Sequence, residues 1–144
     1  GTSPEVLESY LHDAVTRLIH FLLVDMDGHA LPSLFLREQA VPTAAFSLLY
    51  DAAIEPNHKA LTAFAARLTG YSADSQDACL CTNSIVGLVS IYRTHREMCL
   101  RRLGCAAYGK KEIQVITDMA LKNVDALVDC HRLLNGLKSL RATA

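Results

Sequence analysis

The sequence lacks an excess of charge of either sign. Its 144 residues include 14 Lys or Arg and 15 Asp or Glu, a net charge of −1, whereas binding nucleic acid over a broad surface needs a surplus of Lys and Arg on one face. The longest uncharged stretch, Ala78 to Tyr92, is too short for the ~20 residues that cross a bilayer, and no cationic start followed by an apolar run marks a secretory signal. We therefore expect one soluble, cytoplasmic domain that buries roughly 70% of its unfolded surface and has no membrane partner.

Motifs that mark common catalytic and cofactor sites are also missing. There is no G-x-S-x-G, H-E-x-x-H, P-loop or G-x-G-x-x-G, and the histidines are scattered. The five cysteines are an odd number and do not suit a disulfide framework. Cys79 and Cys81 point about 200° apart on a helix, and the one-turn pair His95 and Cys99 has no second ligand pair. We therefore predict buried thiols and no enzyme, cofactor or metal site.

Proline and glycine divide the chain into helices. Ser3, Pro4 and Glu5 have the properties of an N-cap and a first helical turn, and Gly70 stands where a C-cap glycine would. No stretch has the sustained alternation and β-branched content of a strand. The sequence therefore predicts an all-α fold of about six to seven helices. The expected segments are Pro4 to about Asp25, Leu31 to Ala40, Thr43 to about Glu55, Pro56 to Gly70, one that begins between Asp74 and Gln76, and Glu112 to about Leu137.

The uncharged segment from Ala78 to Tyr92 is unusual for a helix, because a helix with no charged face has to be covered on most sides. It is either a central core helix or a helix with its own core on one side and a second subunit on the other. The bulky stripe suits the interior, and the small or polar stripe would let a second helix approach closely. The bulky stripe consists of Ile85, Leu88 and Tyr92, and the small or polar stripe consists of Asn83, Gly87 and Ser90.

The last predicted helix favours the second subunit. Apolar residues repeat along it at spacings of three and four, opposite a charged stripe. Two such helices from each of two chains would close a four-helix bundle about a two-fold axis. The alternative is that the seam packs only inside one chain. We predict a homodimer whose interface contains Asn83, Gly87, Ser90, Ile116, Ala120, Asn123 and Leu127.

Aromatic and polar residues in the middle of the chain suggest a small-molecule pocket. An apolar cavity with a few polar groups is the usual composition of such a site, although each residue alone fits an ordinary core, and His20 fits a core histidine. The predicted lining is His20, Phe21, Phe35, Phe46, Tyr50, Phe64, Asn83 and Tyr92.

The segment Leu36-Arg37-Glu38-Gln39-Ala40-Val41-Pro42-Thr43-Ala44-Ala45 resembles the C-terminal domain of TetR-family transcriptional regulators of the CecR-type branch. The resemblance continues at three further motifs and in the amphipathic last helix, and it covers about residues 4 to 134. Each motif is short and moderately specific, so the signal lies in their order and spacing. The further motifs are Ile54-Glu55-Pro56, Leu68-Thr69-Gly70, and Ser84-Ile85-Val86-Gly87 followed by Tyr92-Arg93.

This resemblance implies an effector-binding and dimerisation domain, whose last two long helices form the dimer bundle and whose cavity accepts an amphipathic or aromatic effector. In such regulators the effector changes the spacing of two N-terminal helix-turn-helix domains, so that the protein, most often a repressor, leaves its operator. No helix-turn-helix segment precedes Pro4, and the chain starts at Gly1 without Met. Residues 1–144 are then either the excised regulatory part of a longer protein, which the start at Gly1 favours, or a natural truncation, and in both cases DNA is reached only through a domain outside this chain. A small cofactor-free enzyme using His95 or a cysteine, and a helical interaction module without a pocket, are the alternatives.

Overall fold

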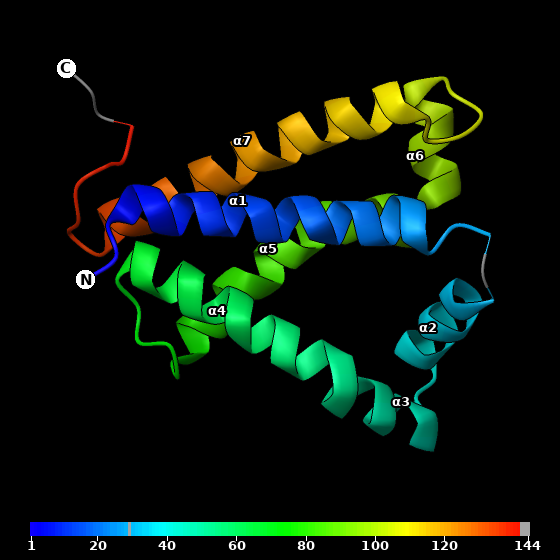
Figure 1. Cartoon of the computed structure of the whole chain (residues 1–144), viewed down its shortest axis with the longest axis horizontal. Coiled ribbons are helices and arrows are strands. Elements are labelled where there is room, and N and C mark those ends of the chain that lie inside the picture. Colours follow the sequence, from blue (N-terminus) through cyan, green and yellow to red (C-terminus); the bar gives the residue numbers. More distant parts are fainter. Residues whose placement is uncertain (29, 142–144) are drawn as a thin grey trace.

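The computed structural model describes residues 1–28 and 30–141, and this part of the chain is helical with no strand (Figure 1). The all-α prediction is confirmed. None of the described helices is long and apolar enough to span a membrane. The elements are α1 (Pro4–His20), η1 (Phe21–Asp25), α2 (Leu31–Ala40), α3 (Ala44–Leu49), η2 (Tyr50–Ile54), α4 (Glu55–Thr69), α5 (Gln76–Thr94), α6 (Arg96–Leu103) and α7 (Lys110–Leu134), where η1 and η2 are single π-helical turns.

The helix ends follow from side chains that satisfy free backbone groups. The Ser3 and Ser75 side chains accept hydrogen bonds from the Val6 and Ala78 amides, so both residues act as N-caps. Gly70 ends α4 with a φ of +85°, a left-handed conformation that glycine adopts at little cost. α4 begins at Glu55, one residue before the expected start at Pro56, but no break separates it from the preceding helix. Pro56 lies in the first turn of α4, and α3, η2 and α4 continue into one another with helical backbone throughout.

The core lies where α1 packs against α4, α5 and α7. α1 buries a stripe with helical spacing, and the apolar faces of the other three helices close over it. Figure 1 shows α1 in front of α5 and beside α7, with α4 below. The residues of this core are Leu7, Leu11, Val15, Ile19, Leu22, Leu23, Met26, Leu61, Ala65, Leu68, Cys81, Ile85, Val89, Ile116, Ala120, Val124 and Val128.

The α2–α3 unit (residues 31–49) contacts this core through Phe35 but contributes few buried residues. It lies beyond the end of α1 in Figure 1, and α2 buries only Pro32 and Glu38, while α3 buries no residue. The unit is connected to the core helices through η1 on one side and η2 on the other. Single π-helical turns inside or beside α-helices are frequent at functional sites. The unit and its two junctions are therefore a candidate site.

Candidate functional site

The outer face of α5 is free of charge and partly apolar. Its buried residues include Ala78, Ile85 and Val89, and the residues on the opposite side are exposed. Gly87 is exposed in the centre of this face, and nothing lies within 4 Å of where its Cβ would be. A second helix could therefore approach the α5 backbone closely there. The outer face comprises Leu80, Ser84, Gly87 and Ile91.

α7 has a similar outer face. Val115 is 57% exposed and Met119 49% exposed, and the same helical stripe continues towards the C-terminus. Lys122 is the charged residue within the stripe. Apolar side chains repeating at helical spacing on a solvent-exposed face are characteristic of helix–helix interfaces. The stripe comprises Val115, Met119, Ala126, Cys130 and Leu133.

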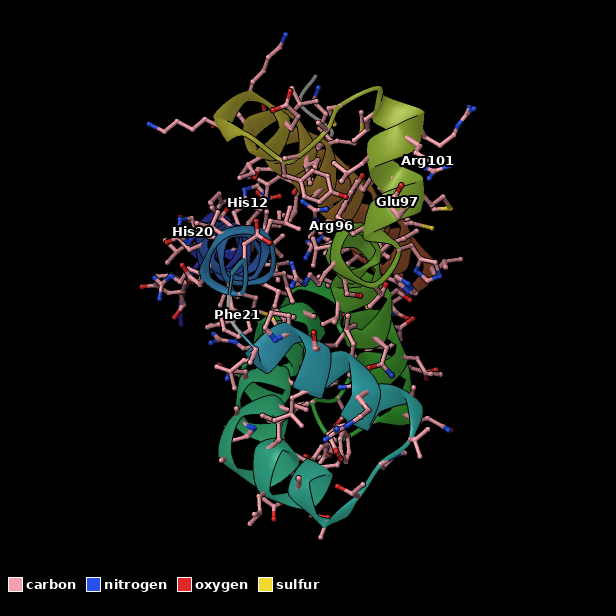
Figure 2. The ribbon with its side chains drawn as sticks, turned by 90° about the vertical axis from the view of Figure 1, so that its right-hand side faces the viewer. His12, His20, Phe21, Arg96, Glu97 and Arg101 are labelled. Carbon is pink, nitrogen blue, oxygen red and sulfur yellow. The ribbon has the colours of Figure 1, made fainter. Side chains whose placement is uncertain are left out.

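The two outer faces lie on the same side of the molecule. α5 and α7 contact each other, and both pack their buried residues against α1. The opposite faces of both helices therefore point away from α1. Figure 2, turned by 90°, shows α1 on one side of the molecule and α5 with α6 on the other. We name this two-helix surface the α5/α7 face.

The predicted interface is partly wrong. Ile116 and Ala120 are 4% and 3% exposed because they belong to the chain's own core, so a second chain cannot reach them. Leu127 is half-buried against the same core. Asn123 and Asn83 are exposed. The face that points outward is displaced by one residue along α7, to Val115 and Met119.

On α5 the predicted stripe lies at the edge of the outer face. Ser90 is half-buried, and Asn83 is turned towards α4, where its Oδ1 lies 2.8 Å from His58 Nε2. His58 in turn lies 3.3 Å from the Thr62 hydroxyl through Nδ1. These polar contacts join α4 to α5 within one chain. Gly87 alone of the three predicted residues lies in the centre of the α5/α7 face.

The eight predicted pocket residues are not gathered into one cavity. His20 points to solvent, and its Nδ1 lies 3.3 Å from Asp25 Oδ1. Phe21 is half exposed on η1. Figure 2 shows these two residues on different sides of α1. Asn83, as described above, contacts His58 instead.

Three of the remaining residues line two separate surface hollows. Phe46 and Tyr50, whose ring centroids are 6.1 Å apart, line a surface hollow of about 260 Å³ together with Ser47 and Asp51. Phe64 pairs with Tyr10 at 5.9 Å in a smaller groove between α1 and α4. The two hollows are on different helices and share no residue.

Phe35 and Tyr92 are half-buried and pack against the core. Tyr92 meets the ring of Tyr108 edge-on at 6.4 Å, and the Tyr108 hydroxyl donates a 2.8 Å hydrogen bond to the Tyr92 carbonyl. Burial, reinforced by the neighbouring Cys99, raises the pKa of Tyr108 to about 12. Tyr108 is therefore a neutral hydrogen-bond donor that fixes the loop before α7.

Sequence reasoning missed the role of Glu38, which is 1% exposed. Its carboxylate accepts hydrogen bonds from the amide and the hydroxyl of Thr43, the N-cap of α3, with the amide 2.8 Å away. The hydrogen bond from the Thr43 amide holds the pKa of the Glu38 carboxyl below its ordinary value, because this effect outweighs the desolvation that raises the pKa. Glu38 therefore fixes the turn from α2 to α3.

The cysteines are not all buried. Cys81 and Cys99 are buried, Cys105 is intermediate, and Cys79 and Cys130 are exposed. Burial raises the pKa of the Cys81 thiol to about 11, so this residue is an unreactive core group. Cys130 lies on the α5/α7 face, which accounts for its exposure.

Taken together, the fold and these surfaces describe an all-α domain with one exposed two-helix face and a separate two-helix unit. Residues 7–130 match the family model of the C-terminal domain of the HTH-type transcriptional dual regulator CecR. The chain therefore belongs to this family of regulator domains, and the resemblance to the CecR-type branch is confirmed. Membership of a transcriptional-regulator family points to regulation and not to catalysis.

A curated relative supports this assignment. The HTH-type transcriptional dual regulator CecR of Shigella flexneri is 30% identical over 107 residues, which are 74% of this chain and 48% of the relative. The chain thus spans about half the length of the relative it matches.

Proposed function

We propose that this chain is the dimerising, effector-responsive domain of a TetR-like transcriptional regulator, acting in the cytoplasm. The α5/α7 face is the observation that carries the proposal. In the full-length protein the domain would set the spacing of two helix-turn-helix domains, and an effector would favour the arrangement that does not fit the operator.

Dimerisation through the α5/α7 face is supported by its composition. Leu80, Ile91, Val115 and Met119 are large apolar residues that remain exposed in the single chain. Two copies related by a two-fold axis would bury the face against itself, giving the four-helix arrangement of paired α5 and α7. The open space at Gly87 would allow the close approach that such a bundle needs.

The dimer is tested by sedimentation equilibrium of wild type and three variants. Wild type is expected at twice the 15.7 kDa chain mass. Met119→Glu and Gly87→Glu are expected at the single-chain mass, because each would place two like charges in a desolvated interface. Leu48→Glu is the matched control, since Leu48 is an exposed apolar residue of α3 outside the face.

Two results would contradict this interface. One is a wild-type chain that sediments only at 15.7 kDa at micromolar concentration. The other is a dimer that persists in both Met119→Glu and Gly87→Glu while circular dichroism shows native helicity. Because both positions are exposed in the single chain, the variants are expected to fold.

The proposed effector region lies where η1 meets the α2–α3 unit. Phe21 and Val24 of η1 and Leu31 and Leu34 of α2 are exposed large apolar side chains in a short stretch of chain. We propose that these side chains lie together and accept an amphipathic or aromatic ligand. The π-helical turns at both ends of the unit provide the two junctions at which it can move relative to the core.

The effector region is tested with 8-anilinonaphthalene-1-sulfonate, an amphipathic aromatic probe whose fluorescence rises on binding. Wild type is expected to bind it saturably and to gain thermal stability, as any ligand of the folded state produces. Leu34→Glu is expected to abolish both effects, and Leu48→Glu to leave them unchanged. Equal binding by the two variants, with native circular dichroism, would instead support an interaction module without a pocket.

A further inference from the structure

Three potential metal ligands from two distant parts of the chain meet between α1 and α7. One atom each of Glu8, His12 and Asp125 lies within 4.8 Å of the others. Glu8 and His12 are one turn apart on α1, and Asp125 faces them from α7, with its Oδ1 2.5 Å from His12 Nε2. Figure 2 marks His12 on α1. Helix packing therefore creates this cluster from residues 113 positions apart.

The cluster is partly shielded from water. The side chains of Glu8 and Asp125 are each 23% exposed, and that of His12 is 30% exposed. Partial burial strengthens the attraction of carboxylates for a cation, because the effective dielectric constant is lower than in water. The site remains open enough for an ion to enter.

The cluster already holds a positively charged group from the chain itself. The guanidinium of Arg141 contacts Glu8 and lies 2.9 Å from Asp125 Oδ1. It also lies 3.8 Å from Asp129, one turn further along α7. This guanidinium is a permanent cation.

One guanidinium does not neutralise this group of acids. Glu8, Asp125 and Asp129 supply three carboxylates around this one guanidinium. Arg132, the other cation near Asp129, donates its hydrogen bonds to the backbone carbonyls of Leu68 and Lys138. The site therefore has uncompensated negative charge, which a doubly charged ion would balance better than Arg141 does.

We propose that Glu8, His12 and Asp125 form a binding site for a divalent first-row metal ion, and that Arg141 occupies this site when no metal is bound. One imidazole and two carboxylates are a ligand set suited to Mn²⁺, Fe²⁺ or Zn²⁺. Three protein ligands leave further coordination positions for water. The metal and the Arg141 guanidinium compete for the same oxygens, so metal binding displaces Arg141.

Displacement would remove the Arg141 contacts, which are part of what holds the C-terminal segment against α7. Residues 139–141 are held there by the Arg141 contacts, by the Ser139 hydroxyl on Asp129 and by a 2.7 Å hydrogen bond from the Leu140 amide to Asp129. The metal would thus exchange a contact within the chain for a direct bridge between α1 and α7. Ligand spacing along the sequence does not reveal this cluster, because Asp125 lies 113 positions from His12.

The test is a titration with Mn²⁺, followed by the electron paramagnetic resonance signal of the free ion. Mn²⁺ is chosen because thiolates bind it weakly, so the exposed cysteines contribute little. Wild type is expected to bind one ion per chain saturably, and His12→Leu and Asp125→Asn to lose this binding. Arg141→Gln is expected to bind about tenfold more tightly or better, since a competing cation within about 4 Å is removed.

The control is His20→Gln, which removes an exposed histidine of the same helix whose partner is Asp25; its affinity should equal that of wild type. Amide exchange at Leu140 should speed up when Mn²⁺ binds. Uptake that persists in both His12→Leu and Asp125→Asn would mean an adventitious ion only and would overturn the site. An unchanged affinity in natively folded Arg141→Gln would overturn the competition with Arg141.

Discussion

Glu38 illustrates how a single carboxylate can order a turn between two helices. It is buried among polar backbone groups at the start of α3, where free amides and the helix dipole favour negative charge. The sequence shows the Glu and the Thr five residues apart, but neither periodicity nor capping rules predict that the two meet across Pro42. Local geometry of this kind becomes visible only in three dimensions.

Removing the N-cap of α3 should destabilise the protein measurably. Thr43→Ala deletes the hydroxyl that bonds both Glu38 and the Ala45 amide. We expect the free energy of unfolding, measured by urea denaturation, to fall by about 1 kcal/mol, the usual cost of losing such a cap. Thr43→Ser should restore most of it, because the hydroxyl returns. Equal stability of Ala and Ser at this position would contradict the cap.

The carboxylate of Glu38 should make stability depend on pH. Its pKa in the folded protein is below the ordinary value of 4.5. A lowered pKa stabilises the folded state at pH values above 4.5, and this contribution is lost as the pH falls through the folded-state value. The melting temperature of Glu38→Gln should therefore lie below that of wild type at neutral pH, and the difference should shrink on acidification. A difference independent of pH would exclude the ionised form as its cause.

At the scale of one element, α7 shows why an interface is hard to predict from periodicity. Apolar residues occupy both its inner face, with Ile116 and Ala120, and its outer face, with Val115 and Met119. Neighbouring residues differ by only 100° around the helix, so a seam can be displaced by one residue without breaking the three-four spacing. The existence and length of the helix were predictable, and its orientation depended on where α1 packs.

The C-terminus of α4 offers a test of how two elements fit together. Gly70 and Gly104 each end a helix, with φ of +85° and +71°. An alanine at either position should cost about 1–2 kcal/mol, because a side chain is strained in this left-handed conformation. At Gly70 a Cβ would also lie 2.9 Å from Leu137 Cδ1, whereas nothing lies within 4 Å at Gly104. Urea denaturation should therefore show a larger loss for Gly70→Ala. In the double variant Gly70→Ala/Leu137→Ala the additional loss of stability at Gly70 should disappear. If the additional loss persists, its cause is not the contact with Leu137.

At the scale of the whole molecule, the features that could be predicted from the sequence are those that short local motifs determine. Proline, glycine and capping residues predicted the start of α1, both ends of α2 and the C-terminal end of α4, and the order of short motifs predicted the family. The shared pocket was not predictable, because Phe46 and Phe64 were assigned to it by residue type alone and the fold places them in different hollows. Glu8, His12 and Asp125 meet only because α1 crosses α7. Contacts between distant segments depend on packing that spacing does not encode.

The reactivity of the two exposed cysteines should test the proposed dimer without any substitution in the α5/α7 face. Cys130 lies on the α5/α7 face of α7, whereas Cys79 lies on α5 outside the residues of that face, and both thiols are exposed in the single chain. Iodoacetamide should modify both at low protein concentration, and peptide mass spectrometry should show no modification of buried Cys81, whose pKa of about 11 leaves little thiolate. As the protein concentration rises through the dimer range, modification of Cys130 should slow several-fold and that of Cys79 should not, because only Cys130 would be covered. If the Cys130 rate stays constant across concentrations at which sedimentation shows a dimer, the two chains associate through another surface.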